Sequence, residues 1–323
     1  MNVTVLFDSI KEDLAKVEHH ILAQLNTEIP LLNELSRYIL ESGGKRLRPA
    51  LLLFAAHMFG TPDAGTYTAA SSLEYLHTAT LLHDDVVDEA DTRRAKKAAR
   101  MLWGNQASVL VGDYLLATSF RNLTSLRNLE ILDTVSEVTS MMAKGELLQL
   151  IRTYDSATES DYMAIIINKT ACLFAAAAKI GALYHGAPPQ AAQALYNYGM
   201  DVGIAFQIVD DALDYSEHRD KVGKPLGIDL KERKVTLPLS RLIQVARPAE
   251  HKALKHILSK AVIEDPDVLE VMAMMRQHEV IPYTLQEARR FTTQSKQYLT
   301  QLPDLPERST LGQLADFVVA RDF

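Results

Sequence analysis

Long stretches of this chain carry apolar residues at helical spacing and contain no turn signal. Near the N-terminus such residues recur at steps of three and four, at Ile10, Leu14, Val17, Ile21 and Leu25, which is typical of one face of an amphipathic helix. The 323 residues include only 14 glycines and 12 prolines, and no candidate break is long enough to be a linker between domains. We therefore expect an all-α fold in which residues 1–323 form a single domain.

Two segments, 51–58 and 171–178, are apolar nearly all round. Helices of this kind are enclosed by other helices, so both segments predict the centre of a helical bundle. Nearer the C-terminus, Thr284 and Glu287 form a capping-box pattern, which predicts that a helix begins there.

One acidic signature occurs twice, as Asp84-Asp85-Val86-Val87-Asp88 and as Asp210-Asp211-Ala212-Leu213-Asp214. Each copy lies in an apolar helical run, so its first and third aspartates share one helix face. Like charges at this spacing repel, and apolar flanks strengthen the repulsion by excluding water. Mg²⁺ would remove that cost, because it accepts one or two carboxylates and completes its shell with water and phosphate oxygens. The alternative is a solvated acidic face.

Basic residues stand where another apolar helix is expected to begin. Lys45 and Arg48 follow two glycines, and Pro49 suits the first turn of the helix. Because a helix N-terminus carries positive partial charge, these cations would be repelled unless an anion lies among them and the free backbone amides. A phosphate group would reconcile the charges, and the alternative is that the side chains point into solvent.

Three polar residues flank the first acidic signature. His77 lies seven residues before Asp84, nearly two turns along the same helix face, and it either shares a cavity with the acid or is a packing residue. Arg93 and Arg94 follow the signature by about a turn. Their guanidinium groups suit bidentate phosphate binding, with ordinary surface charge as the alternative.

Further candidates lie near the second signature or interrupt an apolar run. Lys169 and Thr170 interrupt such a run, so Lys169 must either extend to solvent or meet an anion. Gln207 shares the helix face of Asp210 and either binds phosphate or completes a polar network. Lys224 and Lys234 bracket the following loop. Exposed lysines are common, so Lys224 and Lys234 become candidates for a binding site only because of the other candidate residues around them.

The composition restricts the function class. A formal net charge of −7 disfavours nucleic-acid binding. Cys172 is the only cysteine, which excludes disulfides within the chain and thiolate zinc sites and favours a reducing compartment. The N-terminal residues do not resemble an export signal, and we found no apolar run long enough to span a bilayer. We therefore expect a cytoplasmic protein.

Taken together, these residues resemble the trans-isoprenyl diphosphate synthases, or polyprenyl synthetases. They closely resemble the bacterial long-chain group that includes octaprenyl diphosphate synthase. The resemblance runs essentially from end to end. The motifs that carry it are Gly43-Gly44-Lys45-Arg46-Leu47-Arg48-Pro49, His77 to Glu89 with the first acidic signature, Arg93-Arg94, Trp103-Gly104-Asn105, Gly112-Asp113, Gly145-Glu146, Lys169-Thr170, Phe206 to Tyr215 with the second signature, Gly223-Lys224-Pro225 and Lys234 to Pro238.

The resemblance implies a helical bundle of the isoprenoid synthase type, usually dimeric, with a deep central cavity and two diphosphate sites at its mouth. It implies three Mg²⁺ ions on an allylic diphosphate, held by Asp84, Asp88 and Asp210 with support from Asp211 and Asp214. The residues implied to hold the same diphosphate are Arg93, Lys169, Thr170, Gln207, Lys224 and Lys234. Those implied to bind isopentenyl diphosphate without metal are Lys45, Arg48, His77 and Arg94. Of these residues, the ones expected to take part in catalysis are Asp84, Asp88, Arg93, Lys169, Asp210 and Lys224.

Product length is implied by the residues just before the first signature. In the family, bulky aromatic residues there block the cavity, whereas this chain has Ala79 and Thr80. These small residues favour a long product, about C40, grown from farnesyl diphosphate, with transient membrane contact for release. The alternatives are a shorter-chain synthase, closed by larger residues deeper in the cavity, and a catalytically silent partner subunit. A terpene cyclase would not need the second set of phosphate ligands, and a diphosphatase would need a water-activating base that is not apparent.

The chain departs from the family pattern in two loops. After the first signature, Ala95 and Ala98 replace the usual glycine and threonine, and Lys97 and Arg100 add charge. Arg233 stands where many relatives have glycine. These departures put the local loop conformations, but not the fold, in question.

Overall fold

The computed structural model describes residues 6–93, 96–152, 158–216 and 226–320. Its helices in chain order are η1 (Asp8–Ile10), α2 (Lys11–Ala23), α3 (Pro30–Leu40), α4 (Leu47–His57), α5 (Ala64–Val87), α6 (Ala99–Ser125), α7 (Leu129–Ile151), α8 (Glu159–Ile166), the π-helical segment η2 (Ile167–Ala171), α9 (Cys172–Tyr184), α10 (Pro189–Leu213), α12 (Ile228–Lys231), α13 (Leu237–Val245), α14 (Pro248–Ser259), α15 (Asp265–Gln277), α16 (Val280–Leu299) and α17 (Pro306–Val319). The predicted all-α class is confirmed. Two-residue strands, β1 (Thr92–Arg93) and β2 (Lys96–Lys97), pair antiparallel in the loop after α5.

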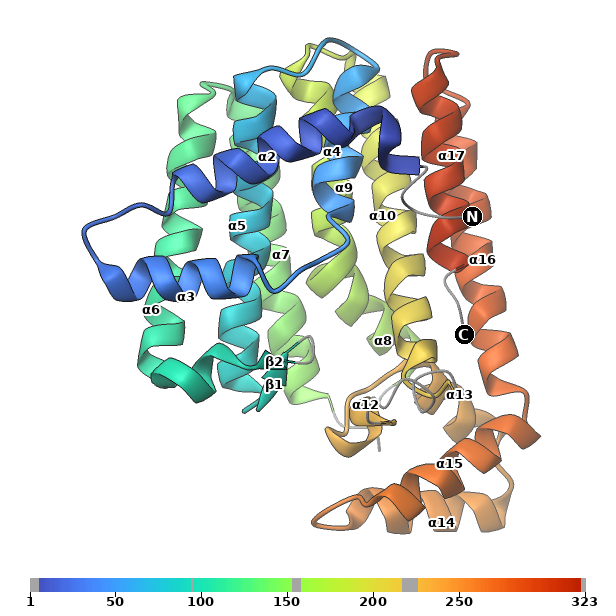
Figure 1. The fold of residues 1–323 in the computed structure, drawn as a ribbon. Helices are drawn as coiled ribbons and strands as arrows, with labels where there is room; N and C mark the ends of the chain where they lie inside the picture. The colour runs from blue at the N-terminus through green and yellow to red at the C-terminus, as the bar shows by residue number, and fades with distance from the viewer. Residues whose placement is uncertain (1–5, 94–95, 153–157, 217–225, 321–323) are drawn as a thin grey trace.

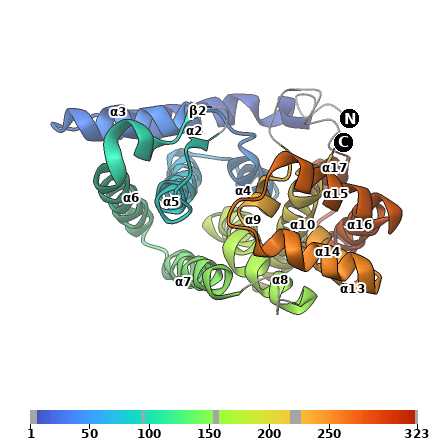
Figure 2. The same ribbon diagram turned by 90° about the horizontal axis from the view of Figure 1, so that it is seen from below.

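The bundle is built around α4, α5, α9 and α10 (Figure 1). α9 packs against α4, α7 and α10, while α6 lies along α5 and α16 lies along α10. Seen from below, α2 and α3 cover one side of the bundle and α7 and α8 lie on the other (Figure 2). As the apolar sequences of 51–58 and 171–178 predicted, α4 and α9 are almost wholly buried.

We expected no apolar run long enough to span a bilayer, but the segment Glu159–Tyr184, which comprises α8, η2 and α9, has the length and composition of one. However, 61% of its most apolar window is buried inside the protein. Neighbouring helices cover it, so it is a core segment of the bundle.

A second, smaller apolar cluster lies beneath the main one. It is formed by the four helices α12, α13, α14 and α15, which contribute residues such as Leu230, Leu242, Leu254 and Val271. Figure 1 shows α12 near the β1–β2 hairpin and the lower ends of α5 and α10, with α14 and α15 below. Tyr215, the residue after the second acidic signature, belongs to this cluster.

The predicted helix start at Thr284 is wrong. α16 begins at Val280, after Glu279 in the left-handed conformation, and it continues through Thr284 and Glu287 without a break. The buried hydroxyl of Thr284 donates a hydrogen bond to the carbonyl of Val280 one turn earlier. A capping residue would accept from a following amide instead.

Candidate active site

Both acidic signatures lie at the C-terminal ends of long helices. α5 ends at Val87 with Asp88 as its C-cap, and α10 ends at Leu213 with Asp214 as its C-cap. A helix C-terminus carries negative partial charge, so the carboxylates meet an unfavourable dipole as well as one another. Such a position favours cations from outside the helix.

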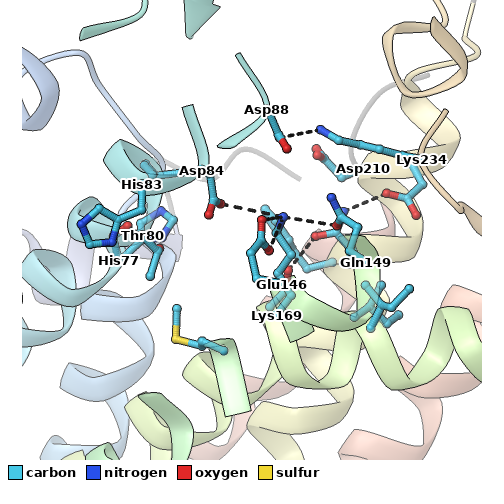
Figure 3. A pocket seen from close by; sticks show the side chains of 18 of the residues that line it. His77, Thr80, His83, Asp84, Asp88, Glu146, Gln149, Lys169, Asp210 and Lys234 are labelled. Carbon is cyan, nitrogen blue, oxygen red and sulfur yellow. Dashed lines mark hydrogen bonds and ion pairs between the residues drawn. The ribbon is translucent and has the colours of Figure 1, made fainter. Parts of the chain in front are cut away.

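The two helix ends face one cavity of about 910 Å³. Its lining includes the first and third aspartates of both signatures, Asp84, Asp88, Asp210 and Asp214. Figure 3 shows Asp84, Asp88 and Asp210 pointing into the same space. The structure therefore brings together acids that are 126 residues apart in the sequence.

Asp84 lies beside a second cluster of charge supplied by α7 and η2. The ammonium of Lys169 is 3.9 Å from Asp84 Oδ2, 2.6 Å from Glu146 Oε2 and 3.2 Å from Gln149 Oε1 (Figure 3). Burial raises the pKa of Asp84 to about 7; Lys169 opposes this shift, and the charges of Glu146 and Asp88 add to it. Burial and the neighbouring carboxylates thus outweigh the effect of Lys169 on the pKa of Asp84.

Backbone geometry places Lys169 in this cluster. The π-helical segment Ile167–Ala171 carries both Lys169 and Thr170, and π-helical turns are frequent at functional sites. α7 approaches it closely at Gly145, where a Cβ would lie 2.5 Å from the backbone nitrogen of Lys169. Only glycine fits this contact, which sets Glu146 beside the lysine.

The middle aspartate of the first signature has a different environment. Asp85 is fully buried, and its Oδ1 accepts hydrogen bonds from Nε and Nη2 of Arg93 at 2.8 and 2.5 Å. Arg93 also borders the cavity. This pair fixes the loop after α5 on the helix end that carries Asp84 and Asp88.

The middle aspartate of the second signature is held in a hydrogen-bonded chain. Asp211 accepts from the Tyr162 hydroxyl at 2.7 Å and from the Gln207 amide at 2.8 Å, and Gln207 accepts from Thr170 at 2.9 Å. Burial raises the pKa of Asp211 to about 7, and these two donors oppose that shift. Of the two roles considered for Gln207, the polar network is present in the structure.

The described part of the region after α10, residues 226–236, contacts both acidic signatures. The backbone nitrogen of Asp229 donates to Asp214 Oδ2 at 2.9 Å, and the ammonium of Lys234 lies 3.1 Å from Asp88 and 2.7 Å from Glu232. Burial alone would lower the pKa of Lys234, but the neighbouring carboxylates outweigh it and raise the pKa. Lys234 therefore stays protonated and ties this region to the first signature.

Lys45, Arg48 and His77 border the same cavity. α4 begins at Leu47, so Arg48 lies in its first turn as predicted, and the Arg48 guanidinium is 4.6 Å from the ring centre of Phe174. Two other predicted residues, Arg94 and Lys224, lie outside the described residues. Every other predicted site residue lines the cavity, as do Ala79 and Thr80 on α5.

Several polar lining residues were given no role from the sequence, among them Glu146, Gln149, Asp229 and Glu232. Glu146 belongs to the Gly145-Glu146 pair that carried the resemblance, so a signal for it existed. Asp229 and Glu232 stand between the second signature and Lys234. Burial and the nearby Asp214 and Asp211 raise the pKa of Asp229 well above its usual range.

The donor set fits hard cations that are shared with a phosphate ligand. Within the described ranges, no three His, Cys, Asp or Glu side chains converge closely enough to hold a metal ion by themselves. The carboxylates of Asp84, Asp88 and Asp210 are spread over two helix ends instead, and oxygen ligands of this kind suit Mg²⁺ completed by water and phosphate. The raised pKa of Asp84 shows that its charged form is disfavoured in the protein alone. A bound cation would stabilise that charged form.

Comparison with known proteins accords with this geometry. The family model described as polyprenyl synthetase matches residues 29–275. The chain belongs to the polyprenyl synthetase family. It is 39% identical over 324 residues to octaprenyl diphosphate synthase of Escherichia coli (strain K12), with all of both chains covered. Members of the family are prenyltransferases, and this chain is therefore a trans-prenyl diphosphate synthase.

Solved structures of family members share the fold. A decaprenyl diphosphate synthase from Rhodobacter capsulatus superposes with a TM-score of 0.93 at 40% identity, covering 99% of each chain. A polyprenyl synthase from Caulobacter crescentus CB15, in complex with calcium and isoprenyl diphosphate, has a TM-score of 0.94 at 35% identity and covers 99% of this chain and 98% of its own. The family binds isoprenyl diphosphates and uses divalent metal ions.

Proposed function

We propose that this chain is a long-chain trans-polyprenyl diphosphate synthase that adds isopentenyl diphosphate repeatedly, head to tail, to an allylic diphosphate primer. The observation that carries the proposal is one cavity that is lined by both acidic helix ends, by the basic side chains of Lys45, Arg48 and His77, and by apolar residues. A product of about C40 and farnesyl diphosphate as primer fit this arrangement best.

The allylic diphosphate would lie between the two acidic signatures. Asp84, Asp88, Asp210 and Asp214 would ligate Mg²⁺, three ions in the full complex. When bound, these ions supply the positive charge that stabilises the departing diphosphate. The residues proposed to contact its oxygens are Arg93, Lys169, Thr170, Gln207, Lys224 and Lys234.

Isopentenyl diphosphate would bind on the other side of the mouth, held by Lys45, Arg48, His77 and Arg94. The allylic C–O bond breaks, the double bond of isopentenyl diphosphate attacks the resulting cation to form a C–C bond, and a proton then leaves the adjacent carbon. The released diphosphate accepts that proton, so no protein base is needed. The stabilisation of negative charge on the leaving group is the main catalytic contribution of the cations.

Chain length follows from the depth of the cavity. Ala79 and Thr80 are small, and α5 continues the lining with Leu76 one turn further from the acids. Leu116, Met142 and Phe174 add apolar lining from three other helices. A long apolar chain can extend past Ala79, and the walls keep water from the carbocation. The octaprenyl and decaprenyl synthases among the relatives support the same choice.

We further propose that the enzyme is a cytoplasmic homodimer with residues 1–323 as one domain. Several of the large apolar side chains exposed on the described surface lie on the adjacent helices α6 and α7, among them Leu110 at 67% and Leu147 at 61% exposure. A second copy of this chain would cover such a face. The apolar product implies transient contact with a membrane at release.

The test is incorporation of labelled isopentenyl diphosphate onto farnesyl diphosphate, followed by chromatography of the dephosphorylated products. We expect Mg²⁺-dependent formation of polyprenyl chains near C40. Products that stop at C20, or incorporation only when geranyl diphosphate replaces farnesyl diphosphate, would support a shorter-chain synthase. The absence of any product with any divalent metal would support the silent partner subunit.

A further inference from the structure

The sequence places three cations, Lys45, Arg46 and Arg48, in one short segment at the start of α4. All three border the cavity. The side chain of Arg46, however, is engaged with carboxylates of the protein. Its Nε lies 2.5 Å from Glu18 Oε1 and its Nη1 lies 2.7 Å from Glu74 Oε2.

The guanidinium of Arg46 joins four helices. Glu18 lies on α2 and Glu74 on α5, while Nη2 of Arg46 donates to the carbonyl of Leu40, the last residue of α3, at 3.0 Å. Arg46 itself is the N-cap of α4. The carbonyl of Leu40 lies in the last turn of α3, where it has no partner within its own helix. One side chain thus fixes the α3–α4 connection to two neighbouring helices.

The backbone at Arg46 is in the left-handed region, with φ of 47° and ψ of 34°. Side chains other than glycine adopt this conformation rarely, and surrounding contacts must hold it. The Arg46 side chain is 18% exposed and that of Glu74 only 6%. Arg46 also donates from Nη2 to Glu18 Oε2 at 3.2 Å, so its guanidinium contacts both oxygens of Glu18 as well as Glu74. This arrangement requires the planar guanidinium, and lysine cannot reproduce it.

The contacts of Arg46 with Glu18, Glu74 and Leu40, called the Arg46 clamp below, lie beside the residues proposed to bind isopentenyl diphosphate. Lys45 immediately precedes Arg46, and Arg48 follows it by two residues. On α5, His77 lies three residues after Glu74, and therefore on the same face of the helix. The ion pair between Arg46 and Glu74 thus connects the two elements that carry Lys45, Arg48 and His77.

We propose that Arg46 is a positioning residue for the isopentenyl diphosphate site, which it assembles by clamping the start of α4 to Glu18 and Glu74 without contacting substrate. This inference rests on the proposed function, because it assigns the neighbouring cations to isopentenyl diphosphate. The two carboxylates of Glu18 and Glu74 neutralise the charge of Arg46. Loss of the clamp loosens one substrate site and leaves the aspartate ends of α5 and α10 in place.

The test is steady-state kinetics of Arg46→Lys with each substrate varied in turn. We expect the KM for isopentenyl diphosphate to rise roughly tenfold, with the KM for farnesyl diphosphate and the kcat at saturation changed less than about twofold. The matched control is Arg37→Lys on the neighbouring α3, where the ion pair with Glu41 is half exposed at 3.5 Å. It should match wild type in all three constants.

Glu18→Gln provides a second variant, because Glu18 is 41% exposed and its loss leaves the Arg46–Glu74 pair intact. We expect a smaller rise in the same KM, and this variant decides the question if Arg46→Lys does not fold. An unchanged KM for isopentenyl diphosphate, or equal rises for both substrates, would overturn the positioning role. A wild-type protein that incorporates no isopentenyl diphosphate would instead overturn the proposed function.

Discussion

The ammonium of Lys234 lies 3.1 Å from Oδ2 of Asp88, so the segment that follows α12 contacts the C-cap of the helix that carries the first acidic signature. Figure 3 shows this pair spanning the mouth of the cavity, with Asp210 beside it. The contact brings a cation to the point where the two helix ends would otherwise present only negative charge. We expect Lys234 to turn from Asp88 to the diphosphate when a metal-bound substrate enters.

The Ala79→Phe variant tests the proposed path of the growing chain. Ala79 is 1% exposed and lines the cavity below Asp84, so a phenyl ring there would block elongation while leaving the phosphate ligands in place. With farnesyl diphosphate as primer, we expect products that stop near C20, with kcat for the first addition close to that of wild type. Chromatography of the products measures this, and Thr80→Ser is the control that keeps the cavity open. Unchanged product length would remove this position from the path.

Gly145→Ala tests the close approach of α7 to the π-helical segment. A methyl group would lie 2.5 Å from the backbone nitrogen of Lys169, and overpacking of this kind costs about 1–3 kcal/mol of stability. We expect a lower free energy of unfolding in urea and a reduced kcat, because Lys169 moves with its backbone. Gly312→Ala is the matched control, since its Cβ would meet only Leu299 at 4.0 Å. Equal behaviour of the two variants would contradict this account.

The sequence predicted only part of the arrangement of the aspartates at the cavity. The i, i+4 spacing correctly predicted that Asp84 and Asp88, and likewise Asp210 and Asp214, face one cavity. It did not predict that Asp85 pairs with Arg93 or that Asp211 accepts from Tyr162. Tyr162 is 49 residues from its partner, and only the packing of α8 against α10 makes that contact.

The polar neighbours of Lys169 have the same explanation. Its apolar flanks left two possibilities, that the ammonium extends to solvent or meets an anion, and the structure shows the second. The partner is Glu146, 23 residues earlier on another helix, which local periodicity does not indicate. Thr284 shows the opposite error, because a capping pattern is local and the continuous packing of α16 on α10 overrides it.

Stability should depend on pH through Asp201, a buried residue on α10 outside the cavity. Its Oδ2 has no hydrogen-bond partner within the described part of the chain. Burial raises its pKa from 3.8 to about 7, although the charge of Arg290 opposes the shift. The folded state therefore binds a proton that the unfolded state releases, so stability from this group is lost as pH rises from about 4 to about 7.

Asp201→Asn should remove that component. We expect the free energy of unfolding of the variant, measured by urea titration at several pH values, to fall less between pH 5 and 7.5 than that of wild type. The difference should be about 1–3 kcal/mol at the upper end. Parallel curves for the two proteins would show that Asp201 titrates at its ordinary pKa.

The proposed dimer face is tested by light scattering during size-exclusion chromatography. We expect a mass of two chains for wild type and a shift toward one chain for Leu110→Lys, because the charge enters an apolar interface. Leu305→Lys, at an exposed residue just before α17, is the control and should remain dimeric. A monomeric wild type would exclude this interface.

The central claim is that the two acidic helix ends bind one magnesium-bound diphosphate between them. Calorimetric binding of farnesyl thiolodiphosphate, an analogue that resists ionisation, tests it directly in wild type, Asp84→Asn, Asp210→Asn and the exposed control Asp113→Asn. We predict tight binding by wild type and the control only with Mg²⁺, and a loss of at least about tenfold in affinity for each signature variant. Equal affinity without metal, or in Asp210→Asn, would contradict the account.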